Sequence, residues 1–239
     1  MKSGQGLYDY AVAPVSRRLE TVLELLGPCR CLGDIGTDHG LVPAHALMRG
    51  LTERAVAVDL RAAPLAVARR TLEARGLSER VALVQGDGLA PLVGLGVDAV
   101  VLAGMSGQAI ERICTRSPEV LSGVEQLIVQ PNTGAWHVRA FAAAAGFHLR
   151  EERMIFLRGR FFVVCAFGPG TGPDDAYANL GTRTSDLYRL GPLLVRRRDA
   201  VALRYYQAQR RRLDAFVKQG LIEHAAELAT FEVGCSYFA

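Results

Sequence analysis

The stretch CLGDIGTDHG (residues 31–40) joins a short apolar run to a glycine-rich turn that carries Asp34, Asp38 and His39. A dinucleotide-binding protein has the pattern G-x-G-x-x-G at this place, where the turn holds a pyrophosphate at a helix N-terminus. This turn lacks the pattern, and its two carboxylates would repel a phosphate and attract a cation. The stretch therefore favours a positively charged nucleoside such as S-adenosylmethionine, which has a sulfonium and an ammonium group and no phosphate. A plainer alternative is that Asp38 only caps the next helix.

The flanking sequence repeats an alternation of strand and helix patterns. Short continuous apolar runs are typical of strands that are covered on both faces. Ser16 is a good N-cap for an opening helix that ends near Gly27. Strands are predicted at 31–36, 55–60, 81–87, 97–105 and 126–132, and helices at 41–50, 64–76, 107–117 and 138–147. The alternation predicts an α/β fold with a Rossmann-like, doubly wound and mostly parallel sheet.

The last third of the chain has a different pattern. Two β-rich runs within residues 153–167 meet at RGR, which predicts an antiparallel hairpin at the edge of the sheet. The Gly/Pro/Asp-rich stretch 168–176 predicts a linker, and the residues from about Thr184 onward have a helical pattern. We therefore expect a methyl-donor-binding domain of residues 1–167 and a small all-helical domain of residues 168–239.

Composition places the chain among folded globular proteins. Half of its 239 residues are hydrophobic, and no apolar stretch is long and clean enough to span a bilayer. The first fifteen residues lack the layout of a secretory signal, so a cytoplasmic protein without membrane contact is expected. The five cysteines show no metal-ligand spacing, and their odd number argues against a disulfide framework. No metal site is expected.

Two further strand ends carry acidic residues. Asp59 closes the second strand, where a carboxylate can accept hydrogen bonds from both hydroxyls of a ribose. Asp87 follows the third strand in QGDG (85–88), where it can bind an adenine amino group while Gly88 lets the backbone approach. Together with the first turn, these ends would hold the amino acid, the ribose and the base of a cofactor. NAD enzymes also have an acid at the second strand end, however, and Asp-Gly is an ordinary turn.

The fourth and fifth strand ends carry small residues and amides. AGMSG (103–107) lacks the Pro-Pro-aromatic motif by which many amino-methylating enzymes hold an exocyclic amine, so that chemistry is disfavoured. Its small residues would let a substrate approach, with Met105 as a soft wall. In QPN (130–132), the amides of Gln130 and Asn132 can read a base edge, and we expect them to orient the reacting base. Tight strand–helix packing and a helix cap at Asn132 are the alternatives.

These stretches together resemble the bacterial tRNA adenine-N1-methyltransferases that modify adenosine 22. The resemblance runs through SRRL, DIGTDHGLVP, QGDG, AGMSG, LIVQPN and HVR, and continues past the linker into LGPLLVRRRDAVALRYY (190–206). It implies a class I methyltransferase domain, a coiled-coil-like helical C-terminal domain used on tRNA, and S-adenosyl-L-methionine as the cofactor.

Within the same stretches, the resemblance implies further contacts and shows departures. Besides the acids and Gly88, the cofactor would contact Gly36, His39, Gly104 and Met105. The substrate would contact Arg18, Ser106, Pro131, His137 and Arg139. The family commonly has a glycine at the position of Ser106, an aromatic residue at that of Leu41, and a Tyr-Glu pair at those of Phe162 and Val163. These departures bear on the target nucleotide more than on the cofactor.

Nine arginines lie between residues 183 and 212, with Tyr205 and Tyr206 among them. Such a surface can bind RNA phosphates while aromatic side chains stack on exposed bases. We expect Arg196, Arg197 and Arg198 to contact tRNA, and either a monomer or a homodimer fits the sequence. The alternative is an ordinary solvated arginine face.

Several functions remain open from the sequence alone. Methylation of adenine N1 needs no strong base, because the unpaired ring nitrogen has a lone pair and catalysis is mainly positioning. A methyltransferase that acts on another RNA site, a small metabolite or a protein is the main alternative. The arginine-rich end argues against a metabolite, and the acidic strand ends argue against a catalytically silent RNA-binding protein. The missing glycine fingerprint makes an NAD-dependent dehydrogenase the weakest option.

Overall fold

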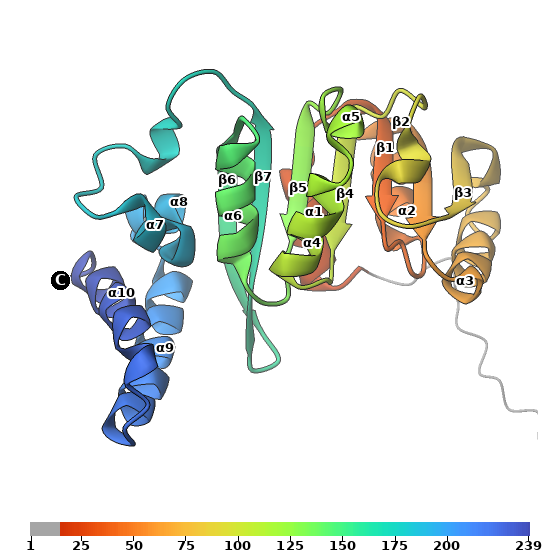
Figure 1. The fold of residues 1–239 in the computed structure, drawn as a ribbon. Coiled ribbons are helices and arrows are strands. Elements are labelled where there is room, and N and C mark those ends of the chain that lie inside the picture. Colours follow the sequence, from red (N-terminus) through yellow and green to blue (C-terminus); the bar gives the residue numbers. More distant parts are fainter. Residues whose placement is uncertain (1–14) are drawn as a thin grey trace, which may run out of the picture.

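A seven-stranded sheet organises residues 15–239, the part of the chain that the computed structural model describes (Figure 1). Its strands are β1 (Cys29–Ile35), β2 (Thr52–Asp59), β3 (Val81–Gln85), β4 (Ala99–Ala103), β5 (Gln126–Gln130), β6 (Phe147–Leu157) and β7 (Arg160–Pro169). They lie in the order β3-β2-β1-β4-β5-β7-β6. Strands β1 to β5 pair in parallel, and β7 runs antiparallel to both β5 and β6. The predicted mostly parallel sheet is confirmed, while residues 1–14, on which the secretory-signal expectation depends, lie outside the described residues.

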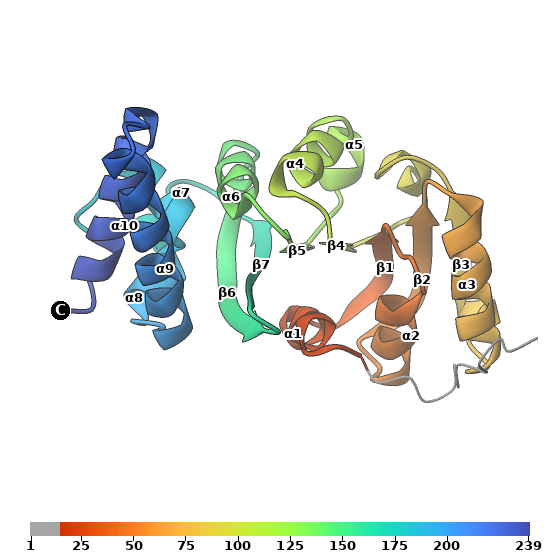
Figure 2. The same cartoon turned by 90° about the horizontal axis from the view of Figure 1, so that it is seen from below.

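Helices cover both faces of the sheet (Figure 2). One face carries α1 (Arg17–Leu25), α2 (Leu41–Met48) and α3 (Ala62–Glu73), and the other carries α4 (Gly107–Thr115), α5 (Pro118–Leu121) and α6 (Ala135–Ala144). The apolar run of β2 is consequently buried at every position from 55 to 59. Ser16 caps α1 as predicted, with its hydroxyl accepting a hydrogen bond from the Leu19 N–H at 3.4 Å.

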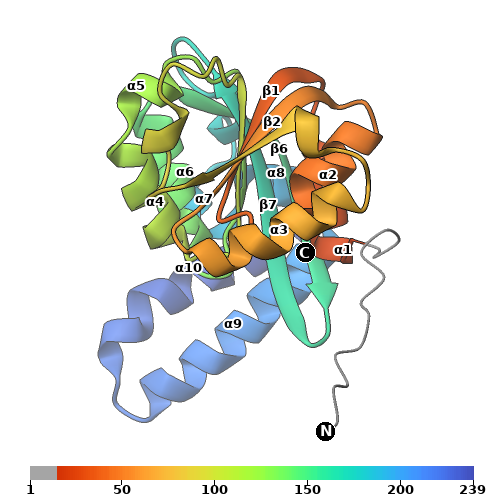
Figure 3. The same ribbon diagram turned by 90° about the vertical axis from the view of Figure 1, so that its right-hand side faces the viewer.

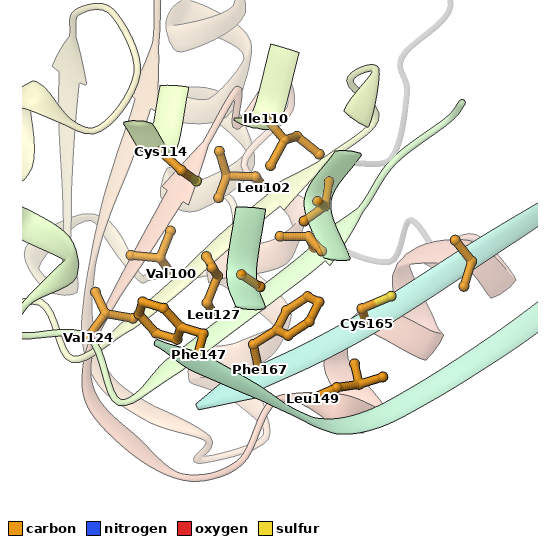
Figure 4. Close-up of a cluster of buried hydrophobic side chains, with 14 of the residues drawn as sticks. Val100, Leu102, Ile110, Cys114, Val124, Leu127, Phe147, Leu149, Cys165 and Phe167 are labelled. Carbon is orange, nitrogen blue, oxygen red and sulfur yellow. The ribbon is translucent and has the colours of Figure 1, made fainter. Parts of the chain in front are cut away.

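The core beneath α4 shows how the short apolar runs are used (Figure 4). Val100 and Leu102 of β4 and Leu127 of β5 pack with Ile110 and Cys114 of α4. Each of these side chains is at most 1% exposed. Burying a side chain of this size stabilises a fold by about 1.5–3 kcal/mol, so this packing fixes the β4–α4 connection.

Strands β6 and β7 form the predicted edge hairpin. Leu157 pairs with Arg160, which leaves Arg158 and Gly159 as a two-residue turn. Both turn residues have positive φ angles, 48° and 76°, as the tightest hairpin turns require. Because β5 and β6 are both antiparallel to β7, they run in the same direction. The hairpin tip therefore lies at the sheet edge where the parallel strands end.

The C-terminal third is helical, as predicted. It contains α7 (Thr184–Leu190), α8 (Pro192–Arg196), α9 (Ala200–Lys218) and α10 (Ala225–Ser236), and α9 and α10 extend as a pair beyond the sheet (Figure 3). Leu190, Tyr206 and Phe231 are buried in the same hydrophobic cluster as Leu127 and Phe167 of the sheet. The division at residue 168 stays a prediction, and this shared core means that cutting there would expose apolar surface.

Short elements were not predicted. They are α5 and the 3-10 turns η1 (Ser78–Arg80), η2 (Ala90–Leu92), η3 (Asp175–Tyr177) and η4 (Ile222–His224). No helix between residues 15 and 239 is long and apolar enough to cross a membrane. All five cysteines are free thiols.

Candidate active site

The carboxyl ends of the parallel strands surround a cavity of about 650 Å³, which we call the cofactor cavity. Open α/β sheets bind their ligands at this edge. Its wall includes Asp34, Gly36, Asp38, His39, Asp59, Asp87, Gly88, Gly104 and Met105. The structure therefore brings together every residue that the sequence assigned to the cofactor.

Asp34 at the end of β1 is buried in this wall, with 3% of its surface exposed. The Thr37 hydroxyl donates a hydrogen bond to its Oδ2 at 2.6 Å. Burial raises the pKa of Asp34 to about 7, against the hydrogen bond from Thr37, which lowers it. A cation beside a buried carboxyl group stabilises its ionised form and so offsets the cost of burial. The position thus suits the positive end of S-adenosylmethionine.

We expect the affinity for S-adenosylmethionine to rise with pH between about pH 6 and pH 8. A bound cation favours ionised Asp34, so below a pKa of about 7 a proton must be released on binding, and each pH unit costs up to about tenfold in affinity. Folding raises the pKa of Asp34 from about 4 to about 7. In the protein without ligand, protonated Asp34 therefore contributes stability below about pH 4, and this contribution is lost as the pH rises from about 4 to about 7.

Calorimetry on the parent and on Asp34→Asn checks this expectation. The asparagine variant should bind more weakly at pH 8 and with a flatter pH profile, while the titration of the ligand itself is common to both proteins. Identical profiles for the two proteins would show that Asp34 does not face the charge.

Asp59 at the end of β2 is held by backbone donors. The Arg61 N–H donates to its Oδ1 at 3.0 Å, and the Asp38 N–H donates to its Oδ2 at 3.4 Å. A carboxylate oxygen has lone pairs for more than one donor. Both oxygens can therefore still accept from vicinal ribose hydroxyls, as the sequence predicts.

The turn after β1 is shaped by Gly36 and Asp38, which have φ angles of 72° and 52°. A Cβ at Gly36 would lie 3.2 Å from the Met105 Cε, so the glycine lets the β1 and β4 loops approach. Helix α2 follows Gly40, and no side chain caps it. The alternative role of Asp38 as a helix cap is therefore wrong, and its carboxylate lies instead 3.4 Å from the His39 Nε2.

Asp87 lies at the outer rim of the cavity, where 58% of its side chain is exposed. Its Oδ2 accepts a hydrogen bond from the Arg116 guanidinium at 3.0 Å. Gly88 beside it has a φ of 63°, and a Cβ there would lie 3.0 Å from the Ile113 Cγ2. The turn thus needs its glycine, while contact between Asp87 and an adenine stays a prediction.

The AGMSG turn is joined directly to the turn after β5. The Gly107 N–H donates to the Thr133 carbonyl at 2.7 Å, and a Cβ at Gly107 would lie 2.0 Å from the Gly134 carbonyl oxygen. Ser106 caps α4, since its Oγ accepts from the Ala109 N–H at 3.2 Å, and it lies on the wall of neither cavity described in this section. Ser106 thus has a structural role, and its contact with the substrate stays a prediction.

Gln130 and Asn132 belong to a chain of hydrogen bonds behind the cofactor cavity. Gln130 is fully buried, accepts a hydrogen bond from the Arg18 guanidinium, and donates to the Asn132 Oδ1 at 3.3 Å. The Asn132 Nδ2 in turn donates to the Gly104 carbonyl at 2.6 Å. The N-cap of α6 is Gly134, so Asn132 is not a helix cap. Gln130 can orient a base only through Asn132, and Arg18 lies on the cofactor cavity rather than in the neighbouring one.

A second cavity, of about 460 Å³, lies between the β5–α6 turn, the β6–β7 hairpin and α9, and we call it the hairpin cavity. It adjoins the cofactor cavity, because Asn132, Arg160 and Phe162 line both. Its wall also includes Pro131, Trp136, Met154, Arg189, Tyr205, Gln209 and Arg212. The sequence assigned Asn132, Pro131 and Arg139 on this wall to contacts, and it placed Arg189, Tyr205 and Arg212 in an RNA-binding surface. The other residues come together through packing between distant segments.

Arg139 lies on the wall of the hairpin cavity, but its burial and its partners contradict the predicted substrate contact. Arg139 is 1% exposed, and its Nε donates to the Glu152 Oε1 at 2.6 Å. Its Nη1 donates to the Tyr188 carbonyl, also at 2.6 Å. These partners use the guanidinium to join α6, β6 and α7, which leaves it unavailable to a phosphate. His137 beside it lines neither cavity and pairs through Nδ1 with the Glu111 Oε2 at 2.7 Å.

Two of the three clustered arginines also bind within the protein. Arg196 donates to the carbonyls of Asp175, Ala176 and Ala178, and Arg197 pairs with Glu151. The third, Arg198, is exposed and has no ion pair with any residue in the described range. All three side chains are exposed, and only Arg198 is free of such a contact, so binding of the three arginines to tRNA stays a prediction.

The strand order and the acidic strand ends define a class I, S-adenosylmethionine-dependent methyltransferase. Residues 15–165 match the family model described as a methyltransferase domain. The chain is 30% identical over 213 residues to the tRNA (adenine(22)-N(1))-methyltransferase of Bacillus subtilis, a match that covers 89% of this chain and 87% of that protein. The chain belongs to this family of tRNA methyltransferases.

Solved structures agree with this assignment. The Bacillus subtilis m1A22 tRNA methyltransferase TrmK superposes with a TM-score of 0.83 at 27% identity, over 93% of this chain and 99% of that one. A candidate tRNA (m1A22) methyltransferase of Streptococcus pneumoniae, solved with S-adenosyl-L-methionine, superposes with a TM-score of 0.82 at 25% identity, over 95% and 100%. The buried Asp34 and the glycine turn against Met105 fit this cofactor, and S-adenosyl-L-methionine is the methyl donor of the fold.

Proposed function

We propose that the protein methylates N1 of adenosine 22 in tRNA and acts in the cytoplasm. The observation that carries the proposal is the junction of the two cavities at Asn132, Arg160 and Phe162. A methyltransferase needs its donor and its acceptor in adjoining spaces, with the reacting atoms in line. The named activity of the Bacillus subtilis relative supports the choice of substrate.

The residues at the junction suit a ring nitrogen that has its own lone pair. S-adenosylmethionine supplies an electrophilic methyl group, and adenine N1 requires no base once the nucleotide is unpaired. Accordingly, the residues common to both cavities are an amide, an aromatic ring and an arginine, and include no carboxylate. The task left to the protein is to extrude the adenosine and align it.

Asn132 is the residue we expect to align the adenine. Its side-chain oxygen accepts from Gln130 and has a second lone pair, and its amide nitrogen donates to Gly104 and has a second hydrogen. The free acceptor and donor match the N6 amino group and N7 of an adenine, a pairing that leaves the N1 lone pair free to react. Gln130 and Arg18 are positioning residues that hold this amide.

Phe162 provides an apolar wall on the other side of the junction. The Arg160 guanidinium carbon lies 5.4 Å from the centre of the Phe162 ring. A flat ring at this place can stack on an extruded base, since every base has a π-face. Phe162 thus keeps the stacking surface of the tyrosine that is common in the family and lacks its hydroxyl.

Methyl transfer to unmodified tRNA transcripts, followed by nucleoside mass spectrometry, tests the proposal. We expect N1-methyladenosine that depends on both protein and S-adenosylmethionine. Asn132→Ala should lower kcat by about tenfold or more, as expected for loss of an aligning hydrogen bond, with the cofactor dissociation constant little changed. Another methylated nucleoside would redirect the proposal to a different RNA site, and no RNA methylation would point to a metabolite, a protein or a silent scaffold.

A further inference from the structure

We propose that the hairpin cavity binds a second nucleotide of the RNA, next to the target adenosine, with its base on Trp136 and its phosphate beside Arg212. The inference rests on the proposed function. The donor and the reacting base meet at the junction of the two cavities. The part of the hairpin cavity between Trp136 and α9 contributes no residue to the cofactor cavity. A base held there is therefore not the base that reacts.

Trp136 offers a stacking surface. It is the protein's only tryptophan and is 36% exposed, although large aromatic side chains usually bury more of their surface. The His137 ring stacks against it with centroids 3.7 Å apart and an angle of 24°. His137 is in turn held by Glu111, so the indole is supported from behind. The Arg189 guanidinium carbon lies 5.1 Å from the indole centre, so this guanidinium must swing away for a base to stack on the indole.

The charges of the cavity favour a phosphodiester. Arg139, Arg160, Arg189 and Arg212 line it together with one acidic residue, Glu227. Arg189 is paired with Glu227 at 3.2 Å, whereas Arg160 and Arg212 have no ion pair with any residue from 15 to 239. The lining is consequently cationic, and an arginine beside an aromatic ring is a usual arrangement for an unpaired nucleotide.

The volume of the hairpin cavity is in the range of ligand-binding sites. Sites for small ligands commonly measure about 300–1,000 Å³, and the hairpin cavity of about 460 Å³ lies in the lower part of that range. Its walls come from α6, the β6–β7 hairpin and α9, so it forms only when the helical C-terminal third packs against the sheet. This arrangement gives α9 a direct part in substrate binding beyond a general attraction to phosphates.

The fluorescence of the single tryptophan tests the inference. An unmodified tRNA transcript should quench it in the full-length protein loaded with S-adenosylhomocysteine. An abasic site at one of the two positions that flank adenosine 22 should remove most of this quench, while an abasic site at the other should not. Trp136→Ala should raise KM for the intact transcript by about tenfold, the loss expected for one stacked base, and Trp136→Phe should largely restore it.

Matched controls separate the subsite from general effects. Trp136→Ala should have no additional effect on the transcript that lacks the stacked base, and its affinity for S-adenosylmethionine should equal that of the parent. Arg212→Ala should raise KM more than Arg211→Ala, which removes the same charge from the next position of α9 outside the cavity. If neither abasic transcript changes the quench and Trp136→Ala keeps the parental KM, the subsite is excluded although methylation persists. Absence of RNA methylation by the parent protein would instead overturn the proposed function, and the subsite with it.

Discussion

Replacing Arg139 by methionine is expected to destabilise the folded protein by about 3–5 kcal/mol, because the change leaves the Glu152 carboxylate buried without its counter-charge. Glu152 is 1% exposed, and no group in the described structure donates to its Oε2. The surroundings cannot relax easily, since a Cβ added to the neighbouring Gly191 would already lie 2.7 Å from this oxygen. Urea denaturation measures the difference.

The double variant Arg139→Met/Glu152→Met is the control. Removing both charges replaces the ion pair by apolar groups of similar length, and this exchange is often close to neutral for stability. We expect the double variant to recover most of the loss and both variants to bind S-adenosylmethionine, because neither residue lines the cofactor cavity. A loss below about 1 kcal/mol in the single variant would show that buried Glu152 does not need Arg139 as its counter-charge.

Gly107→Ala is expected to reduce methyl transfer by about a hundredfold. The added Cβ would lie 2.0 Å from the Gly134 carbonyl oxygen, and backbone cannot move aside as the end of a flexible side chain can. The turns after β4 and β5 must therefore separate. Asn132 would move with them, because its backbone N–H donates to the Met105 carbonyl of the β4 turn at 2.7 Å. Misplacement of an aligning residue by about 1 Å costs on this order in rate.

Gly123→Ala is the matched control for that variant. A Cβ there would meet only the Val120 carbonyl oxygen, at an ordinary 3.7 Å, and the residue has no left-handed φ that an alanine would strain. We expect single-turnover rates close to those of the parent. Parental rates in Gly107→Ala would mean that the two turns separate without moving Asn132.

Much of the fold and of the cofactor cavity follows from local sequence. The short apolar runs predict strands that are covered on both faces, and parallel strands end at one edge. The acids that follow them, Asp34, Asp59 and Asp87, therefore had to lie near one another. The alternation of elements does not encode the strand order, which depends on how the strands pair.

The substrate side depends on contacts between distant segments, which the sequence does not display. Arg139 lies near the QPN turn and has the chemistry of a phosphate ligand, but Glu152 on β6 takes its charge. Arg197 stays half exposed, but it pairs with Glu151 on β6, a partner that the sequence does not show. The exposed Trp136 becomes a candidate contact only because α9 and the hairpin complete the cavity around it.

Primer extension on an unmodified tRNA transcript tests the central claim, methylation of N1 of adenosine 22, most directly. A methyl group on N1 blocks the base-pairing edge, so a reverse transcriptase halts before the modified base. After incubation with the protein and S-adenosylmethionine, we expect a stop immediately before adenosine 22. The stop should be absent without the cofactor and on a transcript that has guanosine at that position. Full-length extension under conditions in which the protein binds both cofactor and tRNA, or a stop at another adenosine, would contradict the assignment.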